Sequence, residues 1–143
     1  MTETSPIHVL IVDDHPMVRK GLASFLLIMD DLELVGEAKD GLDALRRCEH
    51  SPPDVILMDL IMPVTDGVEA TRQIMQQCPC PILVVTATVT GHCAKVYEAL
   101  GHGALDAVNT PVLGRDGVVS GGGQVRTGFD PPGGISPQRL GAV

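Results

Sequence analysis

Aromatic and basic side chains are scarce in this chain of 143 residues. Hydrophobic residues make up 44% of it but aromatic residues only 2%, so a core must be built from Val, Leu, Ile, Ala and Met. Ten Lys and Arg residues stand against 18 Asp and Glu residues, which gives a net charge of −8. Direct nucleic-acid binding is therefore disfavoured, because it needs a basic face that displaces counterions from phosphates.

Long apolar runs are absent as well. No run approaches the roughly 20 apolar residues of a membrane span. The first six residues contain neither the basic region nor the apolar core of a signal peptide. We therefore expect a cytoplasmic protein without membrane contact, and the length favours a single domain with a proper core.

Paired metal-binding spacings are missing from the four cysteines, which are Cys48, Cys78, Cys80 and Cys93. The Cys78-Pro79-Cys80 segment is too short for ordinary zinc chelation, and His92 is adjacent to Cys93 rather than convergent with it. We interpret the cysteines as free thiols in a reducing compartment.

The first 113 residues contain a regular alternation of two patterns. Strand-like apolar runs occur at 7–12, 32–36, 54–59, 81–86 and 104–108. Helix-like stretches lie between them at 16–29, 41–49, 67–77 and 91–101. Strands that alternate with helices indicate βαβ units, so we predict an α/β fold with a doubly wound parallel sheet of five strands.

The composition changes at Gly114, and the segment 114–143 holds 9 of the 16 glycines. We predict one domain over 1–113 followed by a disordered tail, because the segment has no helical period. The fifth strand then has no following helix, which leaves part of one sheet face open. The tail, a second copy in a homodimer or a downstream region must cover that apolar area.

Three aspartates follow two of the predicted strands. Asp13 and Asp14 end the first strand, and Asp59 ends the third. If these strands are neighbours, the carboxylates meet at the edge where open parallel sheets bind ligands. Such an oxygen-rich cluster suits Mg²⁺, and one carboxylate can then attack phosphorus. Alone, the first pair could simply cap a helix, but Asp59 lies in an apolar setting that a cap does not explain.

These residues belong to a wider pattern. Val12-Asp13-Asp14 is followed by Asp-Leu-Ile-Met-Pro at 59–63, by Asp66-Gly67 and by Thr86-Ala87. The combination resembles the receiver domain of two-component response regulators over residues 7–113. The resemblance implies a flavodoxin-like fold with strand order 2-1-3-4-5, and a sensor histidine kinase as the phosphoryl donor.

The resemblance also implies roles for individual residues. Asp59 would be the phosphoacceptor, Asp14 a direct Mg²⁺ ligand and Asp13 a ligand through water, with the Ile61 backbone carbonyl completing the set. Thr86 would be the switch hydroxyl that moves toward the phosphoryl group, and Ala87 the small neighbour that leaves it room. An output domain or partner protein would contact the fourth helix and the fifth strand.

Within receivers, residues 91–106 resemble the regulatory domain of chemotaxis-type protein-glutamate methylesterases, whereas residues 10–19 are similar to receivers attached to DNA-binding domains. The chain contains no Gly-x-Ser-x-Gly segment. We therefore predict no esterase activity for it, and the chain could be a truncated form of a methylesterase.

Two positions depart from the family pattern. Receivers carry Lys-Pro at the end of the fifth strand, but here the pair is Thr110-Pro111, and the aromatic switch position is Ala107. We expect stronger dependence on Mg²⁺ and weaker transmission of the phosphorylation signal. By resemblance, the Thr110–Pro111 peptide bond would be cis.

These departures keep two alternative functions open. One is a pseudo-receiver that docks a partner without phosphorylation. The other is a metal-dependent phosphatase, which is disfavoured because Ile61 stands where a second acid would be needed. We interpret His15 as an exposed loop residue, and Arg19 and Lys95 as solvated helix charges.

Overall fold

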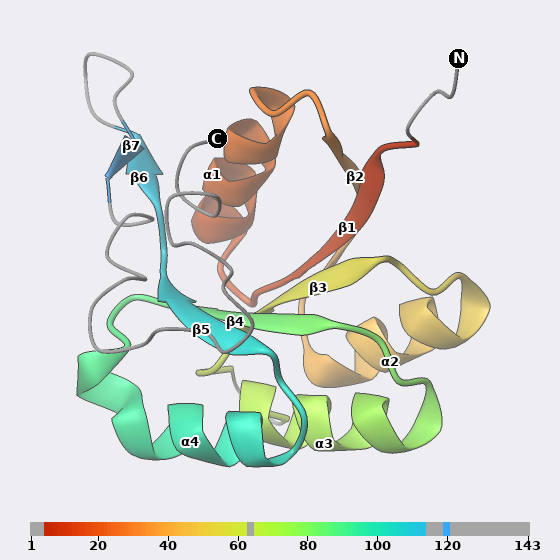
Figure 1. Ribbon diagram of the computed structural model, residues 1–143, viewed down its shortest axis with the longest axis vertical. Coiled ribbons are helices and arrows are strands. Elements are labelled where there is room, and N and C mark those ends of the chain that lie inside the picture. Colours follow the sequence, from red (N-terminus) through yellow and green to blue (C-terminus); the bar gives the residue numbers. More distant parts are fainter. Residues whose placement is uncertain (1–4, 63–64, 114–118, 121–143) are drawn as a thin grey trace.

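The computed structural model describes residues 5–62, 65–113 and 119–120. Five parallel strands form one sheet in the order β2-β1-β3-β4-β5, with helices on both faces (Figure 1). The sheet strands are β1 (Ile7–Val12), β2 (Leu32–Ala38), β3 (Val55–Asp59), β4 (Ile82–Thr86) and β5 (Asp106–Asn109). The helices are α1 (Pro16–Leu27), α2 (Gly41–His50), α3 (Gly67–Gln77), the 3₁₀ turn η1 (Thr90–His92) and α4 (Cys93–Gly101). The predicted fold class and strand order are confirmed.

Local sequence explains where the helices begin. The Asp40 carboxylate accepts a hydrogen bond from the Asp43 amide at 2.8 Å, and the Asp66 carboxylate accepts one from the Glu69 amide at 2.9 Å. Each bond satisfies an amide that the first turn of α2 or α3 leaves free. Helix α1 instead begins with Pro16, whose fixed φ angle suits the first helical position.

Most element boundaries differ from the predictions by one or two residues, and β2, α4 and β5 are examples. Strand β2 continues to Ala38 and contains a bulge, because the pairing register with β1 shifts between Val9 and Leu10. The predicted helix over 91–101 is a 3₁₀ turn followed by a shorter α-helix. Strand β5 begins only at Asp106, because Gly103, with φ of 115°, turns the chain after α4.

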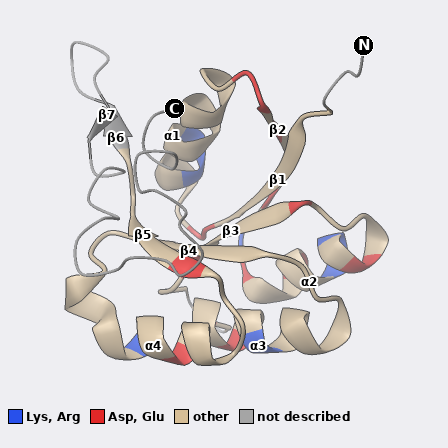
Figure 2. Cartoon of the chain, viewed as in Figure 1, with Lys and Arg blue, Asp and Glu red and all other residues tan. Residues whose placement is uncertain are grey.

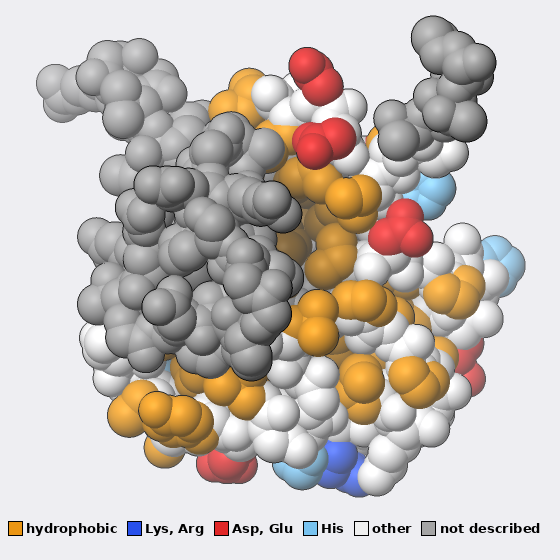
Figure 3. All heavy atoms as spheres, viewed as in Figure 1, with side chains coloured by type: hydrophobic (Ala, Val, Ile, Leu, Met, Phe, Trp, Pro, Cys, Tyr) orange, Lys and Arg blue, Asp and Glu red, His pale blue; other side chains and the backbone are white. Residues whose placement is uncertain are grey.

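The core is unequal on the two faces of the sheet. Helices α2, α3 and α4 cover one face, where Ile56, Met58 and Ile82 are completely buried. Helix α1 covers the β1–β2 half of the other face, and Leu57 and Val108 beyond it are only partly buried. In the space-filling view, hydrophobic side chains reach the surface below α1 (Figure 3).

A two-stranded antiparallel pair follows the sheet, formed by β6 (Val112–Leu113) and β7 (Val119–Ser120). Apart from β7, the segment 114–143 lies outside the described residues, so the disordered tail stays a prediction. The described residues contain no cis peptide bond, so the prediction of a cis Thr110–Pro111 bond is wrong. The trans form is the default for X–Pro bonds by about 0.5–1 kcal/mol.

None of the described helices combines the length and apolar character that crossing a membrane requires. The four cysteines have free thiols. Lys and Arg residues lie on α1, α2, α3 and α4, so the described residues do not gather them on a single face (Figure 2).

Candidate functional site

The carboxyl ends of β1 and β3 bring the three predicted aspartates together. Val12 at the end of β1 pairs with Met58 of β3, so Asp13 and Asp14 emerge next to Asp59. One side-chain ligand atom each from Asp13, Asp14, Asp59 and His15 lies within 4.8 Å of all the others. The predicted three-carboxylate cluster is therefore present, with a histidine added to it.

Backbone and side-chain hydrogen bonds fix Asp13 in this cluster. Its amide donates to the Ala38 carbonyl of β2 at 3.0 Å, and its buried carboxylate accepts from the His15 amide at 2.9 Å. The Arg19 guanidinium donates to the Asp13 carbonyl at 2.7 Å and pairs with Glu37 at 3.3 Å. The interpretation of Arg19 as a solvated charge is wrong, because this side chain is only 20% exposed and links α1 to the end of β1 and to β2.

Asp59 is held where β3 turns into the loop before α3. The Ile61 amide approaches one Asp59 carboxylate oxygen at 3.4 Å, and the Gly67 amide donates to the Leu60 carbonyl at 2.8 Å. A Cβ atom at position 67 would overlap the Asp59 carbonyl oxygen. Gly67 thus permits the close approach of α3 to the end of β3.

Burial and like charge change the acidity of this cluster. Burial is the largest cause that raises the pKa of Asp59 to about 7, and the negative charges of Asp13 and Asp14 raise it further. The Ile61 amide and His15 act in the opposite direction. Burial also raises the pKa of Asp13, although hydrogen bonds from His15 oppose it. A cation among these oxygens would relieve both effects.

Asp14 offers the second indication of a cation. Its Oδ1 atom is buried and accepts no hydrogen bond from any described residue. The Nδ1 atom of His15 lies 3.0 Å away, outside hydrogen-bond geometry, and the His15 side chain is 65% exposed. This buried oxygen accepts no hydrogen bond within the described part of the chain and lies beside two more carboxylates, and together these oxygens form the donor set that hard cations such as Mg²⁺ prefer.

The remaining predicted residues lie at the ends of β4 and β5. Thr86 is 2% exposed, and its carbonyl accepts a hydrogen bond from the Thr110 amide at 2.8 Å. Ala87 is exposed, whereas Ala107 is buried opposite Val84 in the sheet. Thr86 and Thr110 are thus neighbours at the carboxyl ends of the strands, the same end of the sheet at which the aspartates lie.

Sequence reasoning missed two contacts that hold the loops around this edge. The Asn109 side chain accepts a hydrogen bond from the Val89 amide at 2.8 Å and so joins β5 to the loop before α4. The Lys95 ammonium contacts the Asp66 carboxylate at 3.0 Å and joins α4 to the start of α3. Lys95 is 42% exposed, as a solvated charge would be, but it also has this ion-pair partner. Both partners are distant in sequence, so no local pattern could have identified them.

Comparisons with known proteins agree with this geometry. The family model for the response regulator receiver domain matches residues 9–117. A protein-glutamate methylesterase/protein-glutamine glutaminase from Bordetella avium is 56% identical over 109 residues, which is 76% of this chain and 32% of that relative. A second such protein, from Pseudomonas savastanoi, is 48% identical over 74% of this chain and 32% of its own length. The chain thus spans about a third of the curated relatives it matches.

Solved structures give the same result. The response regulator domain of CheB from Thermotoga maritima superposes with a TM-score of 0.69 at 38% identity, covering 73% of this chain and 78% of that one. The receiver domain of a response regulator, NarL, from Mycobacterium tuberculosis superposes with a TM-score of 0.68 at 32% identity, covering 75% and 86%. The family match covers more than half of the sequence, and this chain belongs to the response regulator receiver domain family.

Proposed function

We propose that the chain is the phosphoacceptor of a two-component phosphorelay and that Asp59 accepts the phosphoryl group from a sensor histidine kinase in the cytoplasm. The observation that carries this proposal is the cluster of three carboxylates, in which one buried oxygen accepts no hydrogen bond from the described residues. A partly buried cluster of like charges is costly for a fold, and such perturbed sites mark functional positions.

The residues present fit Mg²⁺. Asp14 and Asp59 would hold the ion directly together with the Ile61 carbonyl, and Asp13 would act through a water molecule. When bound, Mg²⁺ supplies positive charge that offsets the charge of the phosphoryl oxygens. The same charge would lower the pKa of Asp59, so its carboxylate would be ionised at neutral pH.

The chain's own residues carry the transfer step. An ionised Asp59 oxygen attacks the phosphorus of the donor's phosphohistidine, a new O–P bond forms, and the P–N bond breaks. The electron pair of that bond returns to the imidazole of the donor. The Ile61 amide orients the acceptor, since it already approaches an Asp59 oxygen.

Thr86 is the proposed sensor of the phosphoryl group, with Ala87 as the small neighbour beside it. Thr86 is buried at the end of β4, and the loop that follows is held by Asn109. A shift of Thr86 toward Asp59 would bias that loop and the α4–β5 face, where an output domain or partner protein binds. The similarity to methylesterases makes an esterase module of that type the leading candidate for the output.

Nuclear magnetic resonance with beryllofluoride and Mg²⁺ tests this proposal. The complex imitates an aspartyl phosphate, so we expect it to shift the amide signals of Thr86 and of residues 87–101. Asp59→Asn should abolish the shifts. Asp30→Asn, which changes an exposed aspartate between α1 and β2, should retain them. Equal shifts in Asp59→Asn would refute the assignment of the acceptor.

A docking function without phosphorylation is the second candidate. It is favoured by Thr110 at the usual lysine position and by buried Ala107 at the aromatic position. Failure to bind Mg²⁺ in a calorimetric titration would support this alternative over the phosphoacceptor.

A further inference from the structure

A second candidate site lies away from the acidic cluster, in a pocket between β2 and the last turn of α2. Its volume is about 340 Å³, at the lower end of the roughly 300–1,000 Å³ of small-molecule sites. Leu10, Val35 and Pro53 supply apolar walls, and Arg47, His50 and Ser51 supply polar groups. The pocket lies near the start of β3, whereas Asp13, Asp14 and Asp59 lie at the carboxyl ends of β1 and β3.

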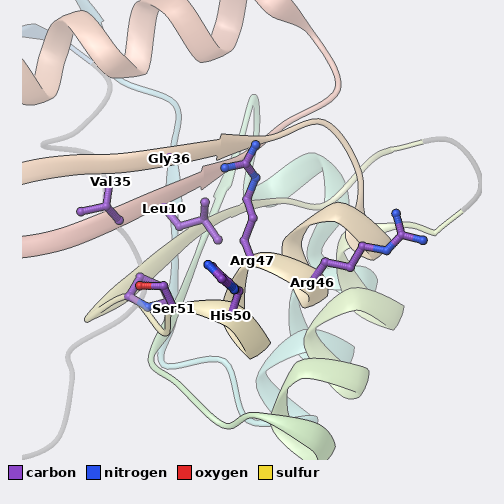
Figure 4. A pocket seen from close by; sticks show the side chains of 8 residues that line it. Leu10, Val35, Gly36, Arg46, Arg47, His50 and Ser51 are labelled. Atoms are coloured by element: carbon purple, nitrogen blue, oxygen red, sulfur yellow. The ribbon is translucent and has the colours of Figure 1, made fainter.

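The charge of the lining is unusual for this chain. The net charge is −8, yet no Asp or Glu lines the described pocket, and two arginines and a histidine do. His50 and Ser51 have no side-chain hydrogen bond with any other described residue, and neither does Arg46 at the rim. Figure 4 shows Arg46 pointing away while Arg47 and His50 lie beside the hollow. The side chains of His50 and Ser51 are therefore free to bind an anion.

A bulge and a glycine create the space for the Arg47 head. The β1–β2 register passes from Val9–Leu34 to Leu10–Gly36, so Val35 is the extra residue of the bulge, and this residue is 46% exposed. A Cβ atom at position 36 would come within 3.0 Å of Arg47 Nη1 and 3.4 Å of a Leu10 methyl group. Gly36 thus lets the guanidinium lie over the strand beside an apolar surface.

Contacts within α2 orient the guanidinium without neutralising it fully. The Nε atom of Arg47 pairs with Asp43 one turn earlier at 3.5 Å, in a pair that is partly exposed. This pair engages one edge of the planar group and leaves the Nη atoms toward Gly36. The helix dipole favours basic residues at this end of α2, but it accounts for neither the hollow nor the bulge.

We propose that this pocket binds a small organic anion, in which a carboxylate or phosphate group contacts Arg47 and His50 and an apolar body contacts Leu10, Val35 and Pro53. Guanidinium groups bind such anions through paired hydrogen bonds, and the apolar walls favour a ring or branched chain over a bare ion. The proposal does not depend on Asp59, since none of the aspartates lines this pocket.

Titration of the full chain, without Mg²⁺, with phenyl phosphate, benzoate, benzyl alcohol and inorganic phosphate tests the proposal. We expect the two aromatic anions to shift the amide signals of Val35, Gly36, His50 and Ser51. The tighter of the two identifies the preferred head group. Binding of benzyl alcohol or inorganic phosphate as tight as that of the better aromatic anion would overturn the proposal, and so would the absence of shifts at these residues.

Variants locate the site. Arg47→Gln should weaken binding by about 10-fold or more, since hydrogen bonds to charged groups are worth roughly 1.5–3 kcal/mol. Gly36→Ala should also weaken it, because the added methyl group displaces the Arg47 head. Arg72→Gln on α3, which removes a guanidinium outside the pocket, should bind as wild type does. Equal loss in Arg47→Gln and Arg72→Gln would reduce the effect to general charge and contradict the site.

Discussion

The carboxyl ends of β1 and β3 and those of β4 and β5 differ in how completely they match the receiver pattern. Between β1 and β3, three aspartates meet within reach of one another, and Gly67 allows α3 to start directly beside Asp59. Between β4 and β5, Thr86 occupies the proposed sensor position, but Thr110 stands where the receiver pattern predicts a lysine and Ala107 where it predicts an aromatic residue. For the proposed function, the difference separates two tasks: the first pair of strands carries the residues proposed for phosphoryl acceptance, and the second lacks two residues that the receiver pattern would use for transmission.

We expect the largest effect from a substitution among the aspartates at the ends of β1 and β3. Asp14→Ala removes a proposed Mg²⁺ ligand, so phosphorylation of Asp59 by a small phosphodonor should fall by about 100-fold, a size typical of lost metal contacts. The initial rate of labelling at saturating donor and increasing Mg²⁺ measures it. Asp30→Asn serves as control, and a wild-type rate in Asp14→Ala would remove this residue from the metal site.

Gly67→Ala should show how tightly α3 packs against the end of β3. The new methyl group overlaps the Asp59 carbonyl, so we expect a loss of about 3 kcal/mol in the free energy of unfolding. Urea denaturation measures the change. Gly21→Ala in α1 is the matched control, because its Cβ meets nothing within 4 Å, and it should stabilise the protein by up to about 1 kcal/mol. Equal stability of the two variants would contradict the close approach.

The pH dependence of stability should report the charge cluster itself. The pKa of Asp59 is raised from 3.8 to about 7, so the folded state binds this proton more tightly than the unfolded state does. Stability from this group is therefore fully present below pH 3.8 and is lost as the pH rises to about 7. Without metal at pH 8, Asp59→Asn should be more stable than wild type by on the order of 2 kcal/mol, allowing for partial solvent screening.

Thermal or urea unfolding of both proteins from pH 4 to pH 8 checks this linkage. The advantage of Asp59→Asn should disappear toward pH 4, and saturating Mg²⁺ should reverse it by stabilising only the wild type. A stability difference that does not change with pH would show that Asp59 titrates as an ordinary aspartate.

We expect the smallest effect from placing a lysine at position 110, after the end of β5. Thr110→Lys adds a cation near the proposed acceptor, so the phosphorylation rate at limiting Mg²⁺ should rise several-fold relative to the rate at saturating Mg²⁺, by roughly 1 kcal/mol of added attraction to the phosphoryl oxygens at a partly exposed site. A Thr110→Met variant controls for side-chain length. Unchanged Mg²⁺ dependence in Thr110→Lys would show that the lysine position has no influence on this receiver.

Most of the fold could be predicted from the sequence because its signals are local. The run Ile7–Val12 and the segment Gly67–Gln77 match their elements in full, since apolar period and flanking turn residues decide them. The aspartates could be located for the same reason: each ends a strand, and strand ends converge. The bulge at Val35 and the extension of β2 to Ala38 could not, because Glu37 and its neighbours carry no continuous apolar pattern.

Contacts between distant segments account for what remained unpredicted. Arg19 with Glu37, Lys95 with Asp66 and Asn109 with Val89 each join elements that only the folded sheet brings together. The pocket beside Arg47 likewise depends on a bulge in one strand and a side chain from the helix that follows it. Such features follow from register and packing, which a residue pattern does not specify.

Intact-mass measurement of phosphorylation tests the central claim most directly. Wild-type chain incubated with a small phosphodonor and Mg²⁺ should gain one phosphoryl group, and it should gain none after Mg²⁺ is chelated. Asp59→Asn should gain none in either condition, while Asp30→Asn should behave as wild type. A phosphoryl group acquired by Asp59→Asn, or by wild type equally with and without Mg²⁺, would contradict the assignment of Asp59 as a magnesium-dependent phosphoacceptor.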